Sequence, residues 1–342
     1  MAINKNNLYL LLFLSFLFTE CNNISKANNK DHHSILPKYE LVKDWPQLPA
    51  GYVLSQVTGI GVDTSQNIFL FHRTGRQWTE PFPDSLISAN TVLLLNRQTG
   101  KLLESWGANL FIMPHGLTVD KDNNVWLTDV ALHQVFKFSH DGKLLITLGI
   151  AKTPGNDSLH FNLPTDVAVA KDGSFYVSDG YGNSRIVKFS REGKYLFAWG
   201  KRGDGPGEFH TPHAIDLDAA GNVYVADRDN NRIGEFDANG TFLKEWKNSE
   251  AVQLYSLAVD KKDNQLFAID YLTIGEIIIK GSDILQFDTA LHLSNRFGRS
   301  GLYAGPKCRY HDIAVDDEGS IYVGDILVNT IQKFKKIKGN NK

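Results

Sequence analysis

The sequence predicts an all-β fold, and three observations support that prediction. The first is a recurring unit made of an apolar strand, a polar turn of Asp, Asn and Gly, a second alternating strand and a terminal Asp, which runs from Met113 to Asp129 in one copy. The second is the spacing, because the copies recur every 42 to 57 residues. The third is that six copies are present, whose equivalent first positions are Thr58, His115, Thr165, His213, Tyr255 and His311. Short alternating strands at this period are typical of β-propellers, so six copies predict a six-bladed β-propeller.

The segments between the repeats complete the predicted blades. Further alternating strands are expected in pairs at 91–96 and 102–106, 134–138 and 144–148, 185–189 and 195–199, and 232–236 and 241–246, joined by turns that contain Gly. Each blade then has four antiparallel strands, and the propeller occupies residues 38–337. A strand at Tyr39–Val42 is expected to pair with the last blade and close the ring, which removes exposed sheet edges. The segment 271–310 is longer than one hairpin needs and predicts an extra loop over one channel mouth.

Composition limits the classes of function. The chain has 342 residues, 42% of them hydrophobic and 11% aromatic, which is enough to bury a large core. The formal net charge is −2 and no block of Lys and Arg is present, so no nucleic-acid partner is expected. Only two cysteines occur, Cys21 and Cys308, which excludes a disulfide framework. We expect a monomer.

The N-terminus has the features of a targeting segment. Lys5 precedes the apolar run 8–18, which is too short to span a bilayer but is typical of a signal peptide over residues 1–21. Cys21 follows, so two outcomes stay open, a lipoprotein anchored to a membrane through lipidated Cys21 or a secreted protein. Residues 22–37 have the composition of a flexible linker, and 338–342 form a basic tail. The protein is therefore expected to be exported, as a periplasmic protein, a membrane-anchored lipoprotein or a secreted protein.

Three histidines stand at the first position of alternate repeats. His115, His213 and His311 are separated by two equal intervals of 98 residues. Every second blade of a six-bladed ring is related by about a third of a turn, so the three imidazoles should converge on the axis. Three neutral imidazoles leave a fourth position open on Zn²⁺, the pattern of a catalytic zinc. The alternative is that each histidine packs on its inner strand and bonds a neighbouring carbonyl.

A second set of residues follows the second strand of each repeat. An Asp occupies this place in five copies, at 129, 179, 227, 270 and 325, which predicts a structural role in bonding turn amides. Arg73 and Arg228 depart from the repeat and would enter the mouth of the channel with the histidines, where a guanidinium suits a carboxylate. Tyr181 follows a glycine and could project inward as a base, with its pKa lowered by a metal and an arginine. A surface or packing role remains the alternative for each of the three.

Several longer motifs resemble those of one known family. They are Phe71–Arg73, Asn109–Leu117, Trp126–Lys137, Pro164–Val169 and Val177–Val187. With these runs the sequence, over about residues 50–335, closely resembles the peptidyl-α-hydroxyglycine α-amidating lyase family of NHL-type six-bladed propellers. The resemblance implies a catalytic zinc held by His115, His213 and His311, with Tyr181, Arg73 and Arg228 as catalytic and substrate-binding residues. It also implies a structural Ca²⁺ held by the backbone carbonyls of Ile60 and Leu117 and the carboxylate of Asp312.

Some positions depart from the family pattern. Tyr310 precedes the third histidine where the family has Pro, and Gly182 stands where animal members have a cysteine, so the disulfide behind the tyrosine is missing. We expect a stand-alone lyase that receives its hydroxyglycine substrate ready-made.

The predicted reaction is zinc-dependent cleavage of the C–N bond of a peptidyl- or N-acyl-α-hydroxyglycine, which gives an amide and glyoxylate. Two alternatives stay open. One is a zinc-dependent hydrolase of a lactone or ester on the same propeller, and the other is a non-enzymatic exported propeller that binds a peptide or glycan.

Overall fold

The computed structural model describes residues 39–250, 252–274, 277–288, 290–298 and 307–337. The predicted signal peptide, Cys21, the linker 22–37 and the basic tail 338–342 lie outside these residues. Within them, no helix has the length and apolar character needed to cross a membrane.

The described strands form six antiparallel sheets of four strands each, as the repeats predict. The first three sheets are β2 (Val57–Val62), β3 (Ile68–His72), β4 (Val92–Leu95) and β5 (Leu102–Trp106); β6 (Pro114–Val119), β7 (Val125–Asp129), β8 (Gln134–Phe138) and β9 (Leu144–Leu148); and β10 (Asp166–Val169), β11 (Phe175–Asp179), β12 (Arg185–Phe189) and β13 (Tyr195–Trp199). We number these sheets blades 1, 2 and 3.

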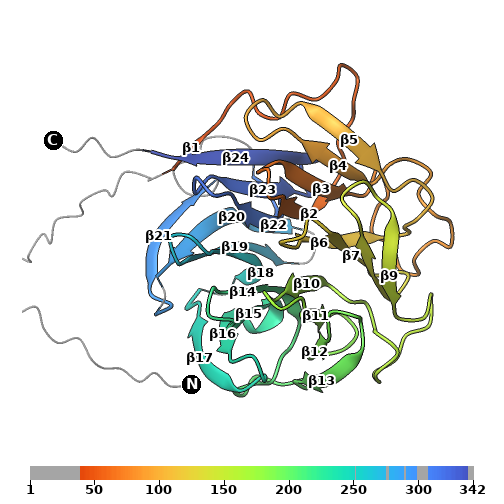
Figure 1. Cartoon of the computed structure of the whole chain (residues 1–342). Helices are drawn as coiled ribbons and strands as arrows, with labels where there is room; N and C mark the ends of the chain where they lie inside the picture. Colours follow the sequence, from red (N-terminus) through yellow and green to blue (C-terminus); the bar gives the residue numbers. More distant parts are fainter. Residues whose placement is uncertain (1–38, 251, 275–276, 289, 299–306, 338–342) are drawn as a thin grey trace, which may run out of the picture. The chain divides into compact units, whose positions relative to one another are not determined.

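The other three sheets are blades 4, 5 and 6. They are β14 (Pro212–Leu217), β15 (Val223–Asp227), β16 (Arg232–Phe236) and β17 (Phe242–Lys247); β18 (Gln253–Asp260), β19 (Gln265–Ile274), β20 (Ile277–Phe287) and β21 (Leu293–Gly298); and β22 (Tyr310–Val315), β23 (Ile321–Asp325), β24 (Thr330–Lys336) and β1 (Tyr39–Leu41). One short 3-10 helix, η1 (Arg228–Asn230), follows β15. Figure 1 shows the sheets in sequence order, from orange through green to blue.

The blades close into a ring. The first strand of each blade lies beside the first strand of the next, and β22 of blade 6 lies beside β2 of blade 1. Strand β1 pairs with β24, with Tyr39 opposite Lys336, so the first strand of the described chain completes the last blade. This confirms the predicted closing strand, which joins the start of the propeller to its last blade.

The predicted extra loop after residue 271 is in part an extension of strands. β19 and β20 have 10 and 11 residues, whereas the other strands have three to eight. The two strands continue to pair beyond Asp270, up to Ile274 opposite Ile277. The run Tyr271–Ile274 is rich in β-branched and aromatic side chains, which favour strands over loops.

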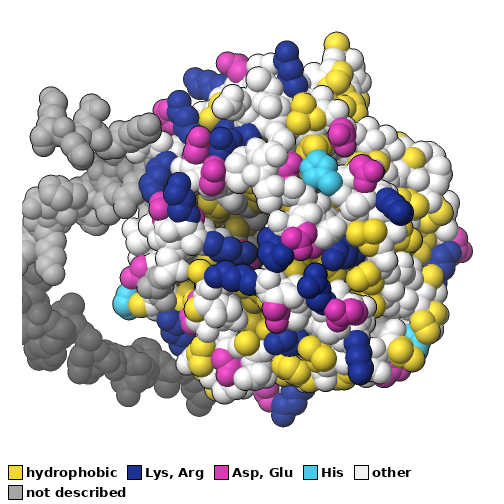
Figure 2. All heavy atoms as spheres, viewed as in Figure 1, with side chains coloured by type: hydrophobic (Ala, Val, Ile, Leu, Met, Phe, Trp, Pro, Cys, Tyr) yellow, Lys and Arg dark blue, Asp and Glu magenta, His cyan; other side chains and the backbone are white. Residues whose placement is uncertain are grey.

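The core lies between the blades. Six clusters of buried apolar side chains are present, each shared by two successive blades. Between blades 1 and 2, for example, Phe71 packs edge to face against Phe111 at 4.9 Å between ring centroids. Because each blade buries its two faces only against its neighbours, the ring holds the inner strands in fixed positions around the axis. On the face seen in Figure 2, Lys and Arg side chains are interspersed with Asp and Glu.

Candidate metal centre and substrate mouth

Each of the three histidines lies at an irregularity of the innermost strand of its blade. The register between the first and second strands shifts at His115, at His213 and at His311, so these residues are not paired in the ladder. Such a bulge turns a side chain away from the regular alternation of a strand. The three imidazoles therefore leave the faces of their blades and point into the channel.

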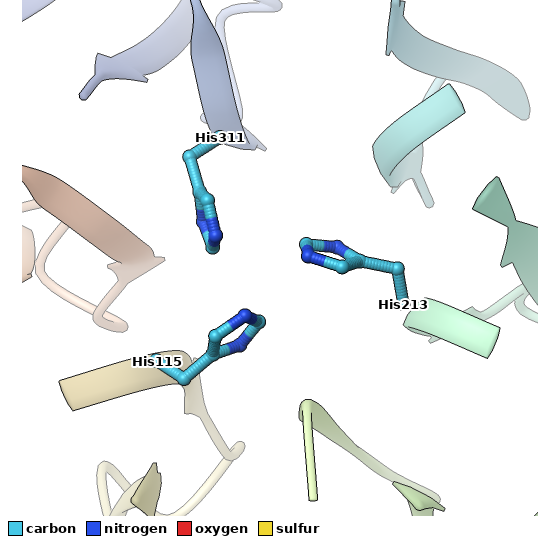
Figure 3. A group of neighbouring side chains, drawn as sticks. All are labelled: His115, His213 and His311. Carbon is cyan, nitrogen blue, oxygen red and sulfur yellow. The ribbon is translucent and has the colours of Figure 1, made fainter. Parts of the chain in front are cut away.

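The three imidazoles converge as the symmetry of the repeats predicts. They come from β6, β14 and β22, and Figure 3 shows them pointing toward one another from three sides. The distances between ring centroids are 4.6, 4.8 and 5.0 Å, and the candidate ligand nitrogens lie within 4.8 Å of one another. All three side chains are buried.

Backbone carbonyls fix the tautomer of each ring. Each Nδ1 lies within hydrogen-bond distance of the carbonyl at the first position of the next blade: 2.7 Å from His115 to Thr165, 2.6 Å from His213 to Tyr255 and 2.9 Å from His311 to Thr58. A carbonyl only accepts, so each Nδ1 carries the proton and each Nε2 keeps its lone pair. Each ring thus bonds a neighbouring carbonyl, as one of the two alternatives expected, and still leaves a possible ligand atom near the axis.

Burial keeps the three rings neutral. It lowers the pKa of His115 to about 3 and lowers the pKa of His213 and His311 well below the usual value, and neighbouring charges add to the effect. Neutral imidazole is the form that binds Zn²⁺, and ligand histidines in zinc proteins commonly donate their other N–H to a carbonyl. The donor set therefore fits a divalent metal such as zinc.

The aspartates that recur at the end of the second strand of the repeats anchor the start of the histidine strands. Asp129 accepts hydrogen bonds from the amides of Ile112 and Met113, just before His115. Asp227 does the same for the two residues that precede Pro212, and Asp325 accepts from the amide of residue 309. The predicted structural role of these aspartates is confirmed, and it sets the position of the histidines.

Tyr181 lies directly against two of the histidines. Its hydroxyl oxygen is 3.0 Å from Nε2 of His115 and 2.9 Å from Nε2 of His213. Gly180 allows this approach, because a β-carbon there would lie 2.0 Å from the carbonyl oxygen of Pro212. Burial raises the pKa of Tyr181, and nearby arginines, Arg228 foremost, oppose that rise. In the chain alone the net effect is a raised pKa, so the predicted lowering would need the added charge of a metal.

Arg73 and Arg228 enter the same mouth, but their hydrogen-bond partners differ. Together with Tyr181 and His311 they line a cavity of ≈490 Å³. Arg228 is already paired, with Nε and Nη2 each 3.0 Å from the carboxylate of Asp229. Arg73 forms no ion pair within the described residues; its Nε donates to the carbonyl of Pro114 and its Nη1 to Gln56.

The environment of Arg73 disfavours its charge. The side chain is 3% exposed, and burial lowers its pKa to about 10. Its guanidinium carbon also lies 5.4 Å from the ring centroid of Trp78, in the long connection between β3 and β4. A buried cation without a carboxylate partner is costly, so this site favours an anionic ligand.

A second cavity lies farther along the inner strands. It has ≈320 Å³ and is lined by Ile60, Leu117 and Asp312, the residues implied for Ca²⁺, together with Asp166. Burial raises the pKa of Asp312 to about 7; it also raises that of Asp166 well above its usual range, and Asp312 adds to this second shift. Among the described residues neither carboxylate has a Lys or Arg partner. Two partly buried carboxylates without a Lys or Arg partner among the described residues fit a hard ion with oxygen ligands.

Sequence reasoning missed two parts of the site. A neighbouring carbonyl was expected as one alternative for each histidine, but not that the acceptors are Thr58, Thr165 and Tyr255, although these residues occupy the first positions of the other three repeats. Arg309 also lines the mouth, and no role was assigned to it. Its position two residues before the third histidine was the available signal, because Met113 and Thr211 stand there in the other two copies.

The comparisons agree with this architecture. Residues 153–272 match a family model described as a 6-bladed beta-propeller, and residues 111–138 match the NHL repeat. A solved structure titled as a streptogramin B lyase has a TM-score of 0.57 and 15% identity, and the match covers 87% of this chain and 97% of that chain. Such a likeness shows the fold alone.

Curated relatives carry the names of amidating monooxygenases and of amidating lyases. Peptidyl-glycine alpha-amidating monooxygenase B of Xenopus laevis is 36% identical over 329 residues, which cover 87% of this chain and 36% of the relative. Peptidyl-alpha-hydroxyglycine alpha-amidating lyase 1 of Drosophila melanogaster is 37% identical over 319 residues, which cover 84% of this chain and 58% of the relative. This chain thus spans about a third to three-fifths of the length of these relatives. It is a six-bladed β-propeller with an NHL repeat, and its sequence is similar to those of peptidyl-α-hydroxyglycine α-amidating lyases.

Proposed function

We propose that the protein is a zinc-dependent lyase that cleaves the C–N bond of a peptidyl- or N-acyl-α-hydroxyglycine and releases an amide and glyoxylate. One observation carries the proposal: the Tyr181 hydroxyl lies within 3.0 Å of Nε2 of two of the three converging neutral histidines, at a mouth that also holds the unpaired Arg73. The names of the lyase relatives support the same reaction class.

The residues of the mouth divide the reaction between them. Arg73 binds the carboxylate of the hydroxyglycine, since Arg228 is already in an ion pair with Asp229, whereas Arg73 donates only to neutral groups among the described residues. This places the α-hydroxyl toward the histidines, where Tyr181 accepts its proton. As the carbonyl of glyoxylate forms, the C–N bond breaks, and the amide nitrogen leaves with the electron pair and one proton, which Tyr181 can return. The atoms balance with no water consumed, so the reaction is an elimination and not a hydrolysis.

Two metals belong to the proposal. His115, His213 and His311 would hold zinc through their Nε2 atoms, and the metal would act there as a Lewis acid toward the α-hydroxyl and lower the pKa of nearby acids. Asp312 and the carbonyls of Ile60 and Leu117 would hold a structural Ca²⁺, which would neutralise the buried carboxylates. Arg228, stacked on Tyr181 at 5.2 Å, would hold that ring and stabilise its anionic form.

A glyoxylate assay tests the proposal. Purified protein is incubated with α-hydroxyhippurate, and glyoxylate and benzamide are measured together with the zinc content. We expect both products in equal amounts, their loss after removal of zinc by a chelator and their return when zinc is added back. Lack of glyoxylate from zinc-loaded protein would contradict the proposal. Arg73→Gln separates the lyase from a zinc hydrolase, because an ester or lactone has no carboxylate for this arginine to bind.

A further inference from the structure

A third guanidinium stands in the substrate mouth, and the proposed reaction does not use it. Arg309, just before β22, lines the same ≈490 Å³ cavity as Arg73 and Arg228. Its guanidinium carbon lies 4.6 Å from the ring centroid of Tyr271 and 5.7 Å from that of Tyr255. Its Nη2 donates to the Tyr255 hydroxyl at 3.1 Å, whereas Nε is buried with no hydrogen-bond partner among the described residues.

The charges of the mouth do not balance. The lining contains three arginines and one carboxylate, that of Glu80, and among the described residues Glu80 pairs with none of them but accepts from the indole of Trp78 at 3.4 Å. Asp229 neutralises Arg228. The hydroxyglycine carboxylate accounts for one of the remaining two cations. Although Glu80 lies in the same lining, Arg309 therefore has no carboxylate in an ion pair with it among the described residues, and an unpaired guanidinium is costly in a partly enclosed site.

Arg73 and Arg309, which form no ion pair with the described residues, are held separately. Arg73 belongs to blade 1 and lies against Trp78, whereas Arg309 precedes the first strand of blade 6 and lies against two tyrosines of blade 5. Stacking on aromatic rings fixes the plane of a guanidinium and leaves its edges for hydrogen bonds. The two edges therefore provide two places for anions within one cavity.

We propose that Arg309 binds a second anionic group of the substrate, carried by the acyl part next to the hydroxyglycine, so that the protein prefers acidic N-acyl-α-hydroxyglycines over neutral ones. The inference rests on the proposed lyase function and names the substrate class of that site. An oxyanion at the guanidinium edge of Arg309 would accept a hydrogen bond from the buried Nε and would also neutralise the positive charge.

Two substrates of the same shape test this assignment. N-acetyl-Glu-α-hydroxyglycine and N-acetyl-Gln-α-hydroxyglycine differ by one charge, and glyoxylate release gives kcat/KM for each. Because a hydrogen bond between charged groups contributes about 1.5–3 kcal/mol, the acidic substrate should be favoured by at least roughly tenfold. In Arg309→Gln the ratio of the two kcat/KM values should fall close to one, and Arg309→Lys should keep an intermediate ratio. Arg191→Gln, at an exposed arginine of another blade, should leave the ratio as it is.

Each outcome is decisive. Equal kcat/KM for the two substrates in the unaltered protein overturns the role of Arg309 and leaves the lyase function standing. An equal loss for both substrates in Arg309→Gln also overturns it, and shows that this arginine binds the common carboxylate or only packs against the tyrosines. If Arg309→Gln does not fold, the ratios in the unaltered protein and in Arg309→Lys decide. Glyoxylate from neither substrate contradicts the proposed function itself, and calorimetric binding of the unreactive N-acetyl-Glu-Gly and N-acetyl-Gln-Gly then tests the charge preference alone.

Discussion

Replacing Tyr181 with Phe separates chemistry from metal binding. The change removes one oxygen, which lies 3.0 and 2.9 Å from Nε2 of His115 and His213, and keeps a ring packed at 5.3 Å from Trp78. The loss of a positioned general base lowers turnover by about 10² to 10⁴, or about 3–5 kcal/mol in the activation free energy. The free energy of unfolding should change by only about 1 kcal/mol, since one hydrogen-bonding group is lost and the ring remains.

The assay combines three measurements on the same preparation. Glyoxylate release gives kcat, elemental analysis gives zinc per chain, and urea unfolding gives stability. We expect kcat to fall by at least a hundredfold with zinc retained. Tyr195→Phe is the matched control, because Tyr195 lies on the outer strand β13 and should tolerate the change without loss. Full activity in Tyr181→Phe would refute the assignment of the base, and loss of zinc would show that the hydroxyl serves the metal site instead.

Three further predictions follow from the packing and burial around the site. Gly180→Ala should lower kcat about 100-fold, because its β-carbon would meet a backbone carbonyl at 2.0 Å and displace Tyr181. The control Gly281→Ala should keep full activity, because its β-carbon would meet nothing closer than 3.5 Å. Equal kcat for the two variants would argue against the positioning of Tyr181 by Gly180. Phe71→Ala should lower the free energy of unfolding by about 3–5 kcal/mol in urea, since the ring is fully buried between two blades, and a loss below about 1 kcal/mol would be inconsistent with that packing. Burial lowers the pKa of His72 from 6.5 to about 4, so as the pH falls the unfolded chain is protonated at His72 before the folded protein is, and the free energy of unfolding falls between about pH 6.5 and 4. Over that range the protein should lose up to about 3 kcal/mol more of its free energy of unfolding than His72→Gln loses. Parallel curves of unfolding free energy against pH would rule this out.

Much of the ring could be predicted because the repeat carries its own signals. Alternation with a period of two, bounded by Gly turns, gave the bounds of β5, β8, β9, β12 and β13 as the structure has them. The equal 98-residue intervals predicted that three imidazoles converge, because sixfold geometry places one position of alternate blades at three equivalent points around the axis.

The features of the site that could not be predicted from the sequence share a physical reason: they arise from the backbone or from contacts between blades. The register shift at each histidine leaves no trace in a pattern of apolar and polar residues, although it aims the ring. The carbonyl that fixes each tautomer is a backbone atom, and any residue at that place could supply it. Arg309 was missed because its role depends on Tyr255 and Tyr271, which come from the preceding blade and become neighbours only in the folded ring.

The measurement that bears most directly on the central claim is zinc K-edge X-ray absorption of the purified protein. The account predicts about one zinc per chain with three imidazole nitrogens at about 2.0–2.1 Å and at least one further light ligand. In His213→Ala that signal should be lost, whereas His292→Ala, at an exposed histidine with 79% of its side chain accessible, should keep it. Protein that binds no zinc, or binds it equally well in both variants, would contradict the claim that the three converging histidines form the metal centre.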